Sequence, residues 1–331
     1  MSASGEIPKK KKPNKKKFCI RIKSPLLGSI TINDKVQGKV TVKSSEIDDY
    51  IIIRSDGSPT FLLSSTIDDY RMKVTDIIRG DDHLTNSFRQ KILYEFLNYN
   101  PSTSHIPLIH NQKNEKLSKR DNSLSIIDYK EKGFLPESII NYLLRMGWSY
   151  ENKEYFTITE AIKLFTLEKI GKSPSKTDEK KLIFLNNHYI KKLDNIVLSQ
   201  ILKKLHIEKY NQGFFFDDVK ILDLIEVYKS RANTLNEVVE NINSLNVVPK
   251  NFNDEEKKIL KVSKKYKKTI VKEFSDILNW NSDSIENKLS GIVKKLNIGF
   301  KEIAQPIRLT IIGKIDGPSI SKIMGVLGKN E

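Results

Sequence analysis

Cysteine is almost absent from this sequence, since Cys19 is the only one among 331 residues. A single thiol excludes an internal disulfide framework and a multi-cysteine zinc site. Long apolar runs are also missing, because no stretch reaches the roughly 18 residues that a spanning helix needs. Residues 1–17 are rich in lysine and no apolar core follows them, so they do not resemble a secretory signal. These absences predict a protein of a reducing compartment, the cytoplasm.

Arginine is scarce in a chain that is otherwise strongly basic. It supplies nine of the 57 lysine and arginine residues, and with 41 acidic residues the net charge is +16. Such a surplus predicts a polyanionic partner such as nucleic acid. A general overuse of lysine, isoleucine and asparagine explains the charge as well, so charge alone does not decide. With 38% hydrophobic residues, the chain can bury a core.

The first third of the sequence alternates short apolar segments with turn residues, which is the pattern of β-strands. This alternation predicts strands at residues 18–22, 29–32, 39–42 and 50–54. Residues 55–59, Ser-Asp-Gly-Ser-Pro, predict a turn. The basic stretch that ends at residue 17 has nothing to bury and predicts a disordered arm.

Helical periodicity dominates the rest of the chain. It begins at residues 84–98 and resumes after residues 105–126, which have little apolar periodicity and predict a loop. Proline in the first turn at Pro136 and a glycine at Gly147 delimit one helix. An apolar stripe at steps of three and four predicts a single helix over residues 259–277.

Two lysines stand three residues apart inside the predicted loop, in the stretch Lys116-Leu117-Ser118-Lys119-Arg120. Their ammonium groups can converge on phosphate oxygens, where a cation is most valuable as negative charge develops on a leaving group. A loop suits this chemistry because it can close over a nucleotide and then release the product. The same spacing is also that of an ordinary solvated surface in a lysine-rich chain. Spacing alone leaves both interpretations open.

This stretch resembles the KMSKS-type loop of class I aminoacyl-tRNA synthetases, in the KLSKR form of glutamyl-tRNA synthetases. The resemblance extends over about residues 18–331 and rests on several motifs in the same order. They lie at residues 53–60, 68–69, 74–84, 86–90, 129, 133–137, 141–149, 172–174, 185–186, 228, 231–232 and 306–309. Several ordered motifs carry weight that a single short motif does not.

One motif of that family does not occur. Its members carry a HIGH-type motif in a nucleotide-binding half, whose histidines stabilise the transferring phosphate and help to bind ATP. The 331 residues contain no His-x-Gly-His, and all five histidines lie in other contexts. The resemblance therefore implies an incomplete catalytic domain, and it predicts that this chain alone is inactive.

The resemblance implies roles for two residues in amino-acid binding. Arg79 would bind the side-chain carboxylate of glutamate, because a guanidinium pairs with a carboxylate bidentately. A surface ion pair is the alternative role for this arginine. Phe61 stands where the family usually has tyrosine, so the ring is kept and a hydroxyl contact is lost. The neighbouring Asp82 and His83 are interpreted as structural, and a metal site there lacks a second cluster of ligands.

The resemblance also implies roles in ATP binding and catalysis. Lys119 would bind ATP and stabilise the departing pyrophosphate, with Lys116 in support. The backbone of Leu108 and Ile109 would border the adenine, which is compatible with ordinary packing at a strand end. Arg231 and the more distant Arg308 are candidates for tRNA binding, with a structural role as the alternative for each.

The fold implied is an incomplete class I, Rossmann-type α/β catalytic domain followed by all-α domains. Four parts are expected along the chain. These are a basic disordered arm at 1–17, the C-terminal part of the catalytic domain with the KLSKR loop at 18–125, a helical stem-contact region at 126–197 and an anticodon-binding helical domain at 198–331.

The implied activity is that of a glutamate–tRNA ligase, with ATP and Mg²⁺ as cofactors. Its partners would be glutamate and the glutamate tRNA, with the glutamine tRNA as a further candidate, and the protein would be a monomer. The main alternative is a truncated or degenerate paralogue that binds tRNA without aminoacylating it. An enzyme that transfers glutamate to a tRNA base is disfavoured, because such relatives usually lack an anticodon-binding domain. A DNA-binding protein is disfavoured because no compact basic recognition unit is evident.

Overall fold

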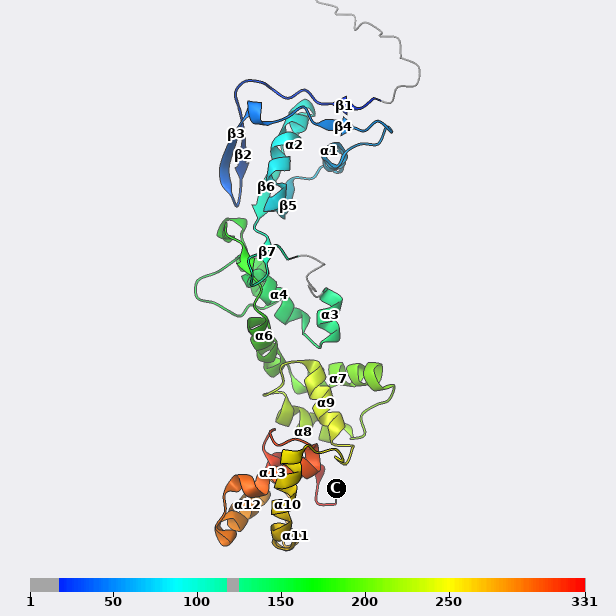
Figure 1. Ribbon diagram of the computed structural model, residues 1–331, viewed down its shortest axis with the longest axis vertical. Coiled ribbons are helices and arrows are strands. Elements are labelled where there is room, and N and C mark those ends of the chain that lie inside the picture. Colours follow the sequence, from blue (N-terminus) through cyan, green and yellow to red (C-terminus); the bar gives the residue numbers. More distant parts are fainter. Residues whose placement is uncertain (1–17, 118–124, 331) are drawn as a thin grey trace, which may run out of the picture. The chain divides into compact units, whose positions relative to one another are not determined.

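The computed structural model describes residues 18–117 and 125–330 (Figure 1). Contacts among them separate two compact units. The sheet unit comprises residues 18–117, 145–154 and 159–177, and the helical unit comprises residues 125–144, 155–158 and 178–330. The arm predicted at residues 1–17 lies outside the described residues.

The sheet unit is built on a four-stranded mixed sheet with the strand order β3-β2-β6-β5. Its strands are β2 (Ser29–Asp34), β3 (Gly38–Lys43), β5 (Asp76–Gly80) and β6 (Ser102–Ile106). β2 and β3 form an antiparallel hairpin, whereas β6 runs parallel to both β2 and β5. Gly38 begins β3 with a φ of 83°, a backbone conformation that favours glycine and permits the tight hairpin.

Helices connect the strands of the sheet unit, as parallel neighbours require. α1 (Phe61–Met72) precedes β5, and the short η2 (Asp81–His83) followed by α2 (Leu84–Phe96) leads from β5 to β6. Apolar residues at period two on β2 and at helical spacing on α2 meet in one core. The buried members of this core are Ile22, Ile30, Ile32, Tyr50, Phe88, Ile92 and Leu93.

Smaller elements complete the sheet unit. β1 (Ile20–Arg21) pairs antiparallel with β4 (Ile51–Ile53), and β7 (Ile109–His110) pairs parallel with β8 (Ser175–Lys176). The 3₁₀ turns η1 (Ser44–Glu46) and η4 (Leu167–Lys169) lie in connections, and α5 (Ile158–Leu164) begins at the boundary between the units.

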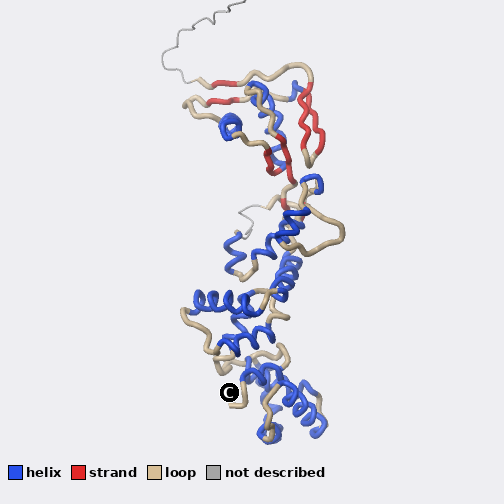
Figure 2. Tube along the Cα trace, turned by 180° about the vertical axis from the view of Figure 1, so that it is seen from behind, coloured by secondary structure: helices blue, strands red, loops and turns tan. Residues whose placement is uncertain are grey.

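The helical unit contains no strand within the described residues, as Figure 2 shows by colour. Its helices are α3 (Ile126–Glu131), α4 (Pro136–Arg145), α6 (Glu179–Lys192), α7 (Asn195–Tyr210), α8 (Asp218–Tyr228), α9 (Leu235–Ser244), α10 (Asp254–Ser263), α11 (Lys267–Ser275), α12 (Ser282–Leu296), α13 (Phe300–Ile312) and α14 (Ile320–Leu327). Many begin at a side chain that accepts a hydrogen bond from a free backbone N–H of the first turn. These N-cap residues include Asp178, Asp194, Asp217, Thr234, Asn253 and Asn281.

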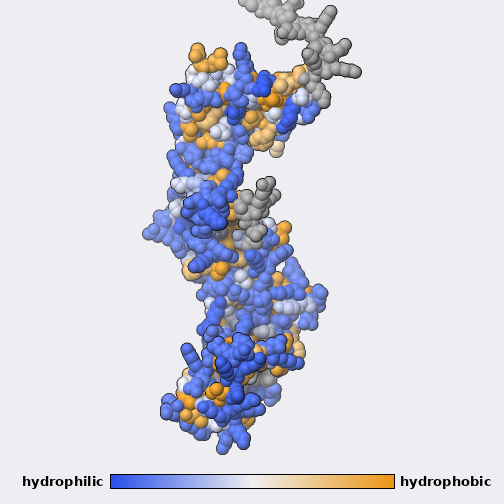
Figure 3. Space-filling model, viewed as in Figure 1, coloured by the Kyte–Doolittle hydropathy of each residue, from blue (hydrophilic) through white to orange (hydrophobic). Residues whose placement is uncertain are grey.

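Two hydrophobic clusters hold the helical unit together. One packs α7, α8 and α9 around fully buried residues such as Leu202 and Leu224, and the other packs α12, α13 and α14 around Ile285 and Leu289. On the face drawn in Figure 3, hydrophilic side chains cover most of the surface and the hydrophobic ones form separate patches.

Most predicted elements are confirmed at their predicted places. The strands expected at 29–32, 39–42 and 50–54 are β2, β3 and β4, and the strand expected at 18–22 is the two-residue β1. The helix expected to start at Pro136 is α4, which ends two residues before Gly147. The helix expected from residue 84 is α2.

Two predicted elements are wrong in part. The single helix over 259–277 is broken by a 3₁₀ turn at Lys264–Tyr266, which buries Tyr266 and leaves Val262 55% exposed, because a tighter turn rotates the apolar stripe. The loop over 105–126 instead begins with the end of β6 and includes β7. Buried polar residues in β6 hide the strand from a hydrophobicity pattern, since Thr103, Ser104 and His105 are all buried.

Candidate functional site

The carboxyl ends of the parallel strands β5 and β6 meet at one edge of the sheet, the usual place for a ligand in such sheets. A Cβ atom added at Gly80, the last residue of β5, would lie 2.6 Å from Oδ1 of Asp82 and 3.1 Å from Cδ2 of Leu108. A side chain at this position would require Asp82 and Leu108 to move. The segment after β5 and the segment after β6 therefore touch at this edge.

Arg79 lies on β5, directly before this edge, and is half-buried. Its Nε donates to Nε2 of His105 at 3.1 Å, and its Nη2 donates to Oε1 of Gln90 at 2.8 Å and to the hydroxyl of Ser87. Nη1 has no hydrogen-bond partner within the described residues. Burial lowers the pKa of Arg79 from its usual range, and the guanidinium remains charged.

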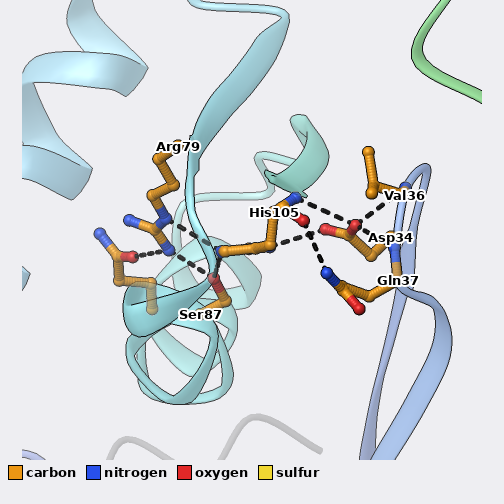
Figure 4. Close-up of polar contacts among 7 residues, drawn as sticks. Asp34, Val36, Gln37, Arg79, Ser87 and His105 are labelled. Atoms are coloured by element: carbon orange, nitrogen blue, oxygen red, sulfur yellow. Dashed lines mark hydrogen bonds and ion pairs between the residues drawn. The ribbon is translucent and has the colours of Figure 1, made fainter. Parts of the chain in front are cut away.

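A buried aspartate stands on the other side of His105 (Figure 4). Asp34 ends β2, and its Oδ2 lies 2.6 Å from Nδ1 of His105. Burial lowers the pKa of His105, against the opposing effect of Asp34. Burial acts to raise the pKa of Asp34, yet hydrogen bonds from the backbone of Gln37, His105 and Val36 and from the His105 ring lower it overall. The carboxylate is therefore ionised and the imidazole neutral at pH 7.

Phe61 lies at the first turn of α1, with its side chain 53% exposed. Its ring centroid is 5.9 Å from that of His83, and the two rings are tilted. α1 is tied to the arginine site by a second contact, because Nε2 of Gln90 donates to the hydroxyl of Ser65 at 2.9 Å. The predicted positions 61 and 79 thus belong to one neighbourhood, and a hydroxyl is absent from the ring at position 61.

The first lysine of the KLSKR stretch reaches the same edge. Nζ of Lys116 lies 2.6 Å from Oδ2 of Asp82, and this ion pair lowers the pKa of the Asp82 carboxyl. Leu117 donates its N–H to the carbonyl of Ile109 at 3.0 Å, which ties the start of the stretch to β7. Ser118, Lys119 and Arg120 lie outside the described residues.

The two arginines predicted for tRNA binding lie in the helical unit, and both contact one loop. Nη1 of Arg231 donates to the carbonyl of Gly317 at 2.7 Å. Arg308 donates to the carbonyls of Ile315 at 2.9 Å and Pro318 at 3.2 Å, and burial lowers its pKa. Arg231 is exposed and Arg308 is half-buried. Both side chains hold the loop between α13 and α14.

Four residues of the site are not identified by the sequence analysis: Asp34, Ser87, Gln90 and His105. Each is at most 4% exposed, although all are polar. For Ser87 and Gln90, a polar residue inside the predicted helix from residue 84 is the signal that could have revealed them. Asp34 and His105 lie outside the predicted strands, so they gave no such signal. Each needs a partner in the folded protein, and here the partners are one another and Arg79.

The described residues lack the features of two other site types. They contain no group of three or more histidine, cysteine, aspartate or glutamate side chains that could hold a metal ion. None of their helices is long and apolar enough to cross a membrane. At the sheet edge lie the guanidinium of Arg79 and the ammonium group of Lys116, which is paired with Asp82.

Comparison with known proteins gives a consistent result along the whole chain. Residues 2–184 match the family of class I tRNA synthetases (E and Q), catalytic domain, and residues 190–331 match an anticodon binding domain. The chain is 39% identical to a glutamate–tRNA ligase of Pelagibacter ubique over 94% of its length and 38% identical to glutamate–tRNA ligase 2 of Anaplasma phagocytophilum over 99% of its length.

A solved structure agrees with these matches. The glutamate tRNA ligase of Elizabethkingia meningosepticum, crystallised in complex with its amino acid, superposes with a TM-score of 0.81 at 27% identity, over 94% of this chain and 66% of that one. The chain spans 67% and 70% of the two curated relatives. It therefore belongs to the glutamate–tRNA ligase family of class I tRNA synthetases, with a class I catalytic fold and a helical anticodon-binding domain.

Proposed function

We propose that this chain serves in the ATP-dependent activation of glutamate to glutamyl-adenylate and the transfer of glutamate to the 3′ end of tRNA. Membership in the family supports the reaction class. The observation that carries the proposal is the guanidinium of Arg79, held by buried partners at the ligand edge of the sheet with Nη1 unpaired within the described residues. Arg79 forms no salt bridge with a carboxylate among those residues, although the charges of Asp69 and Asp34 act on it.

Arg79 would bind the side-chain carboxylate of glutamate. The free N–H groups of Nη1 suit an anionic acceptor, and the neutral His105 adds no competing charge. Phe61 would contribute an apolar ring beside His83. Since phenylalanine has no hydroxyl, the orientation of the substrate would depend more strongly on the arginine.

The KLSKR stretch would contact ATP, the nucleotide that this family uses. Lys116 lies at the sheet edge and would release Asp82 to contact phosphate, and Lys119 would stabilise the departing pyrophosphate. The backbone of Leu108 and Ile109 follows β6 directly and would border the adenine. Mg²⁺ would arrive with the nucleotide, and because the described residues offer no metal cluster we assign it no protein ligands and no step.

The helical unit would bind tRNA, with the glutamate acceptor as the main partner and the glutamine acceptor as a second, and the protein would act as a monomer in the cytoplasm. Arg231 is the better candidate for a tRNA contact, because it is exposed and Gly317 occupies only its Nη1. Arg308 would act by holding the loop between α13 and α14.

Glutamate binding by the 331-residue chain tests the amino-acid part of the proposal. Titration calorimetry with L-glutamate should show binding that Arg79→Ala removes, because the charged partner of the carboxylate is lost. Arg89→Ala is the matched control, since Arg89 pairs with the exposed Asp48 at 2.7 Å in the same unit. Equal affinity in wild type and Arg79→Ala would refute the role of Arg79.

A second candidate function is tRNA binding without amino-acid activation. It is favoured by the absence of a His-x-Gly-His motif from these 331 residues. The chain alone should then show little ATP–pyrophosphate exchange, because losing one preorganised group typically costs about 10²–10³ in rate. It should still rank glutamate tRNA above an unrelated tRNA at physiological salt, and Arg231→Ala should reduce that difference. Exchange at the rate of a normal synthetase would exclude this candidate.

A further inference from the structure

A chain of buried polar side chains crosses three adjacent strands of the sheet. Asp34 ends β2, His105 lies on β6, and Arg79 lies on β5 as the register partner of His105. Figure 4 shows the imidazole of His105 between the Asp34 carboxylate and the Arg79 guanidinium. His105 is fully buried and Asp34 is 4% exposed. A buried charged group persists only when its partners are fixed, so this chain must have a defined pattern of donors and acceptors.

The donor pattern follows from Asp34. Its Oδ1 accepts three backbone N–H groups, those of Val36, Gln37 and His105, at 3.0, 2.9 and 3.0 Å. An ionised carboxylate can only accept, so Nδ1 of His105 must carry the hydrogen that points to Oδ2. A neutral imidazole with its hydrogen on Nδ1 has a free lone pair on Nε2.

The lone pair on Nε2 is what Arg79 requires. A guanidinium has donors only, and its Nε lies 3.1 Å from that nitrogen. The hydroxyl of Ser87 lies 2.9 Å from the same nitrogen, so the Ser87 hydroxyl and Nε of Arg79 share that one lone pair as donors, and the Ser87 oxygen accepts from Nη2 of Arg79. The other hydrogen of Nη2 is accepted by Gln90. Every donor of the guanidinium except those of Nη1 then has a defined acceptor.

We propose that Asp34 and His105 are positioning residues, which fix the guanidinium of Arg79 so that Nη1 is the donor presented to a carboxylate ligand. Asp34 acts through His105 by setting its tautomer, and neither residue contacts the ligand. The use of that donor for glutamate rests on the proposed function. The fixed orientation of the guanidinium is a property of the chain itself and can be measured without any ligand.

The variant Asp34→Asn should change the tautomer of His105 while it keeps the shape of the side chain at position 34. The amide oxygen can still accept the three backbone N–H groups, but the amide nitrogen donates to Nδ1 of His105 and forces the hydrogen onto Nε2. That hydrogen would face the N–H of Arg79 Nε, and the hydrogen bond would be lost. Asp76→Asn on β5 is the matched control, because it makes the same charge change at an exposed pair with Lys35.

NMR spectroscopy of the 331-residue chain gives the readout. We expect a neutral His105 with its hydrogen on Nδ1 and an Nε–H signal of Arg79 that exchanges slowly with water, assigned by its absence in Arg79→Lys. Asp34→Asn should switch the tautomer and make the Arg79 signal exchange at least tenfold faster, whereas Asp76→Asn should change neither. A protected Arg79 signal despite a switched tautomer would overturn the proposal.

Two further results keep the proposal open to refutation. If Asp34→Asn does not fold, the wild-type spectrum decides, and a charged His105 or a hydrogen on Nε2 would contradict the proposal. The affinity for L-glutamate should fall about tenfold in Asp34→Asn, a size typical of groups that orient a ligand-binding side chain. An unchanged affinity with a lost Arg79 signal would refute a role in binding, whereas no binding by wild type would refute only the proposed use of Arg79.

Discussion

The sheet unit and the helical unit both bury polar side chains, but they use them differently. In the helical unit, Asn186 is fully buried and its amide contacts the backbone of Leu135 at 2.8 Å and of Asn233 at 2.6 Å. In the sheet unit, Asp34 also accepts backbone N–H groups, but its second oxygen contacts the His105 ring, which contacts Arg79. Arg79 keeps Nη1 unpaired within the described residues. One set closes loops, and the other ends at the edge where we propose that a ligand binds.

This difference separates the arginine proposed to bind a ligand from an arginine of similar burial that holds a loop. Arg308 and Arg79 are both half-buried, and burial lowers the pKa of both. Arg308 donates from Nη1 and Nη2 to backbone carbonyls of a neighbouring loop, whereas Arg79 leaves a whole nitrogen at the carboxyl edge of parallel strands. Nε of Arg308 is buried without a hydrogen-bond partner among the described residues, so an unpaired donor alone does not distinguish the two. The place of the unpaired donor does, because Arg79 lies at the carboxyl edge of parallel strands.

The largest expected effect concerns loop closure in the helical unit. Asn186→Ala removes the acceptor of Leu135 N–H and of the Ser138 hydroxyl and the donor to Asn233, and it leaves buried groups unpaired. The free energy of unfolding should fall by about 3 kcal/mol. Urea unfolding followed by far-UV circular dichroism, which reports mainly on the helices, measures it.

The neighbouring asparagine provides the control for this experiment. Asn187 is half-buried and makes one hydrogen bond, to the carbonyl of Ala232 at 2.6 Å. Asn187→Ala should therefore cost about 1 kcal/mol. Equal losses in the two variants would show that the contacts of Asn186 do not close the loops.

The next effect concerns acidification of the sheet unit. The pKa of folded His105 is lowered, so below its usual value of about 6.5 the unfolded chain binds a proton that the folded chain does not. Stability should therefore fall as the pH falls, by up to about 2 kcal/mol between pH 7 and pH 5. The lowered pKa of Asp34 adds a loss only at more acidic pH, as that carboxylate becomes protonated.

Hydrogen exchange of the β2 and β6 amides, corrected for intrinsic rates, measures this pH dependence. The amides of α12 are an internal reference, because the cluster around Ile285 contains no histidine. The variant His105→Gln has no titratable group at this position, so the pH dependence of hydrogen exchange in β6 should become weaker. If hydrogen exchange of the β6 amides depends on pH as steeply in His105→Gln as in wild type, the pH dependence arises from another titratable group.

Much of the fold could be predicted because apolar spacing determined it. The strands β2 and β3, with alternating isoleucines and valines, and the helix α4 after Pro136 follow their patterns. β6 could not be predicted, because its stability depends on hydrogen bonds to two neighbouring strands and its buried residues are polar. The break at Lys264–Tyr266 could not be predicted either, because the apolar stripe continues through this 3₁₀ turn at helical spacing.

Only those residues of the candidate site that lie in a recognisable sequence motif could be predicted. Arg79 and Lys116 were identified by resemblance, and the structure places both at one sheet edge. Ser87 and Gln90 lie in a motif of the resemblance but were assigned no role. Asp34 and His105 were not identified, because they are 71 positions apart in the sequence and no local pattern links them. Pairing across strands creates this part of the site, so only the folded chain shows it.

The smallest effect concerns the exposed ion pair at that edge. Lys116 and Asp82 have side chains 56% and 35% exposed, so breaking their 2.6 Å contact should change stability by only about 0.5 kcal/mol. That energy corresponds to a factor of roughly two in an equilibrium constant. If Asp82 competes with phosphate for Lys116, Asp82→Asn should raise the affinity of the chain for inorganic pyrophosphate about twofold, and the gain should fade in high salt.

Asp76→Asn, which breaks the exposed pair with Lys35 in the same unit, should leave that affinity unchanged. Calorimetric titration with pyrophosphate would measure both, and a gain of the same size in the two variants would show a general effect of charge rather than release of Lys116.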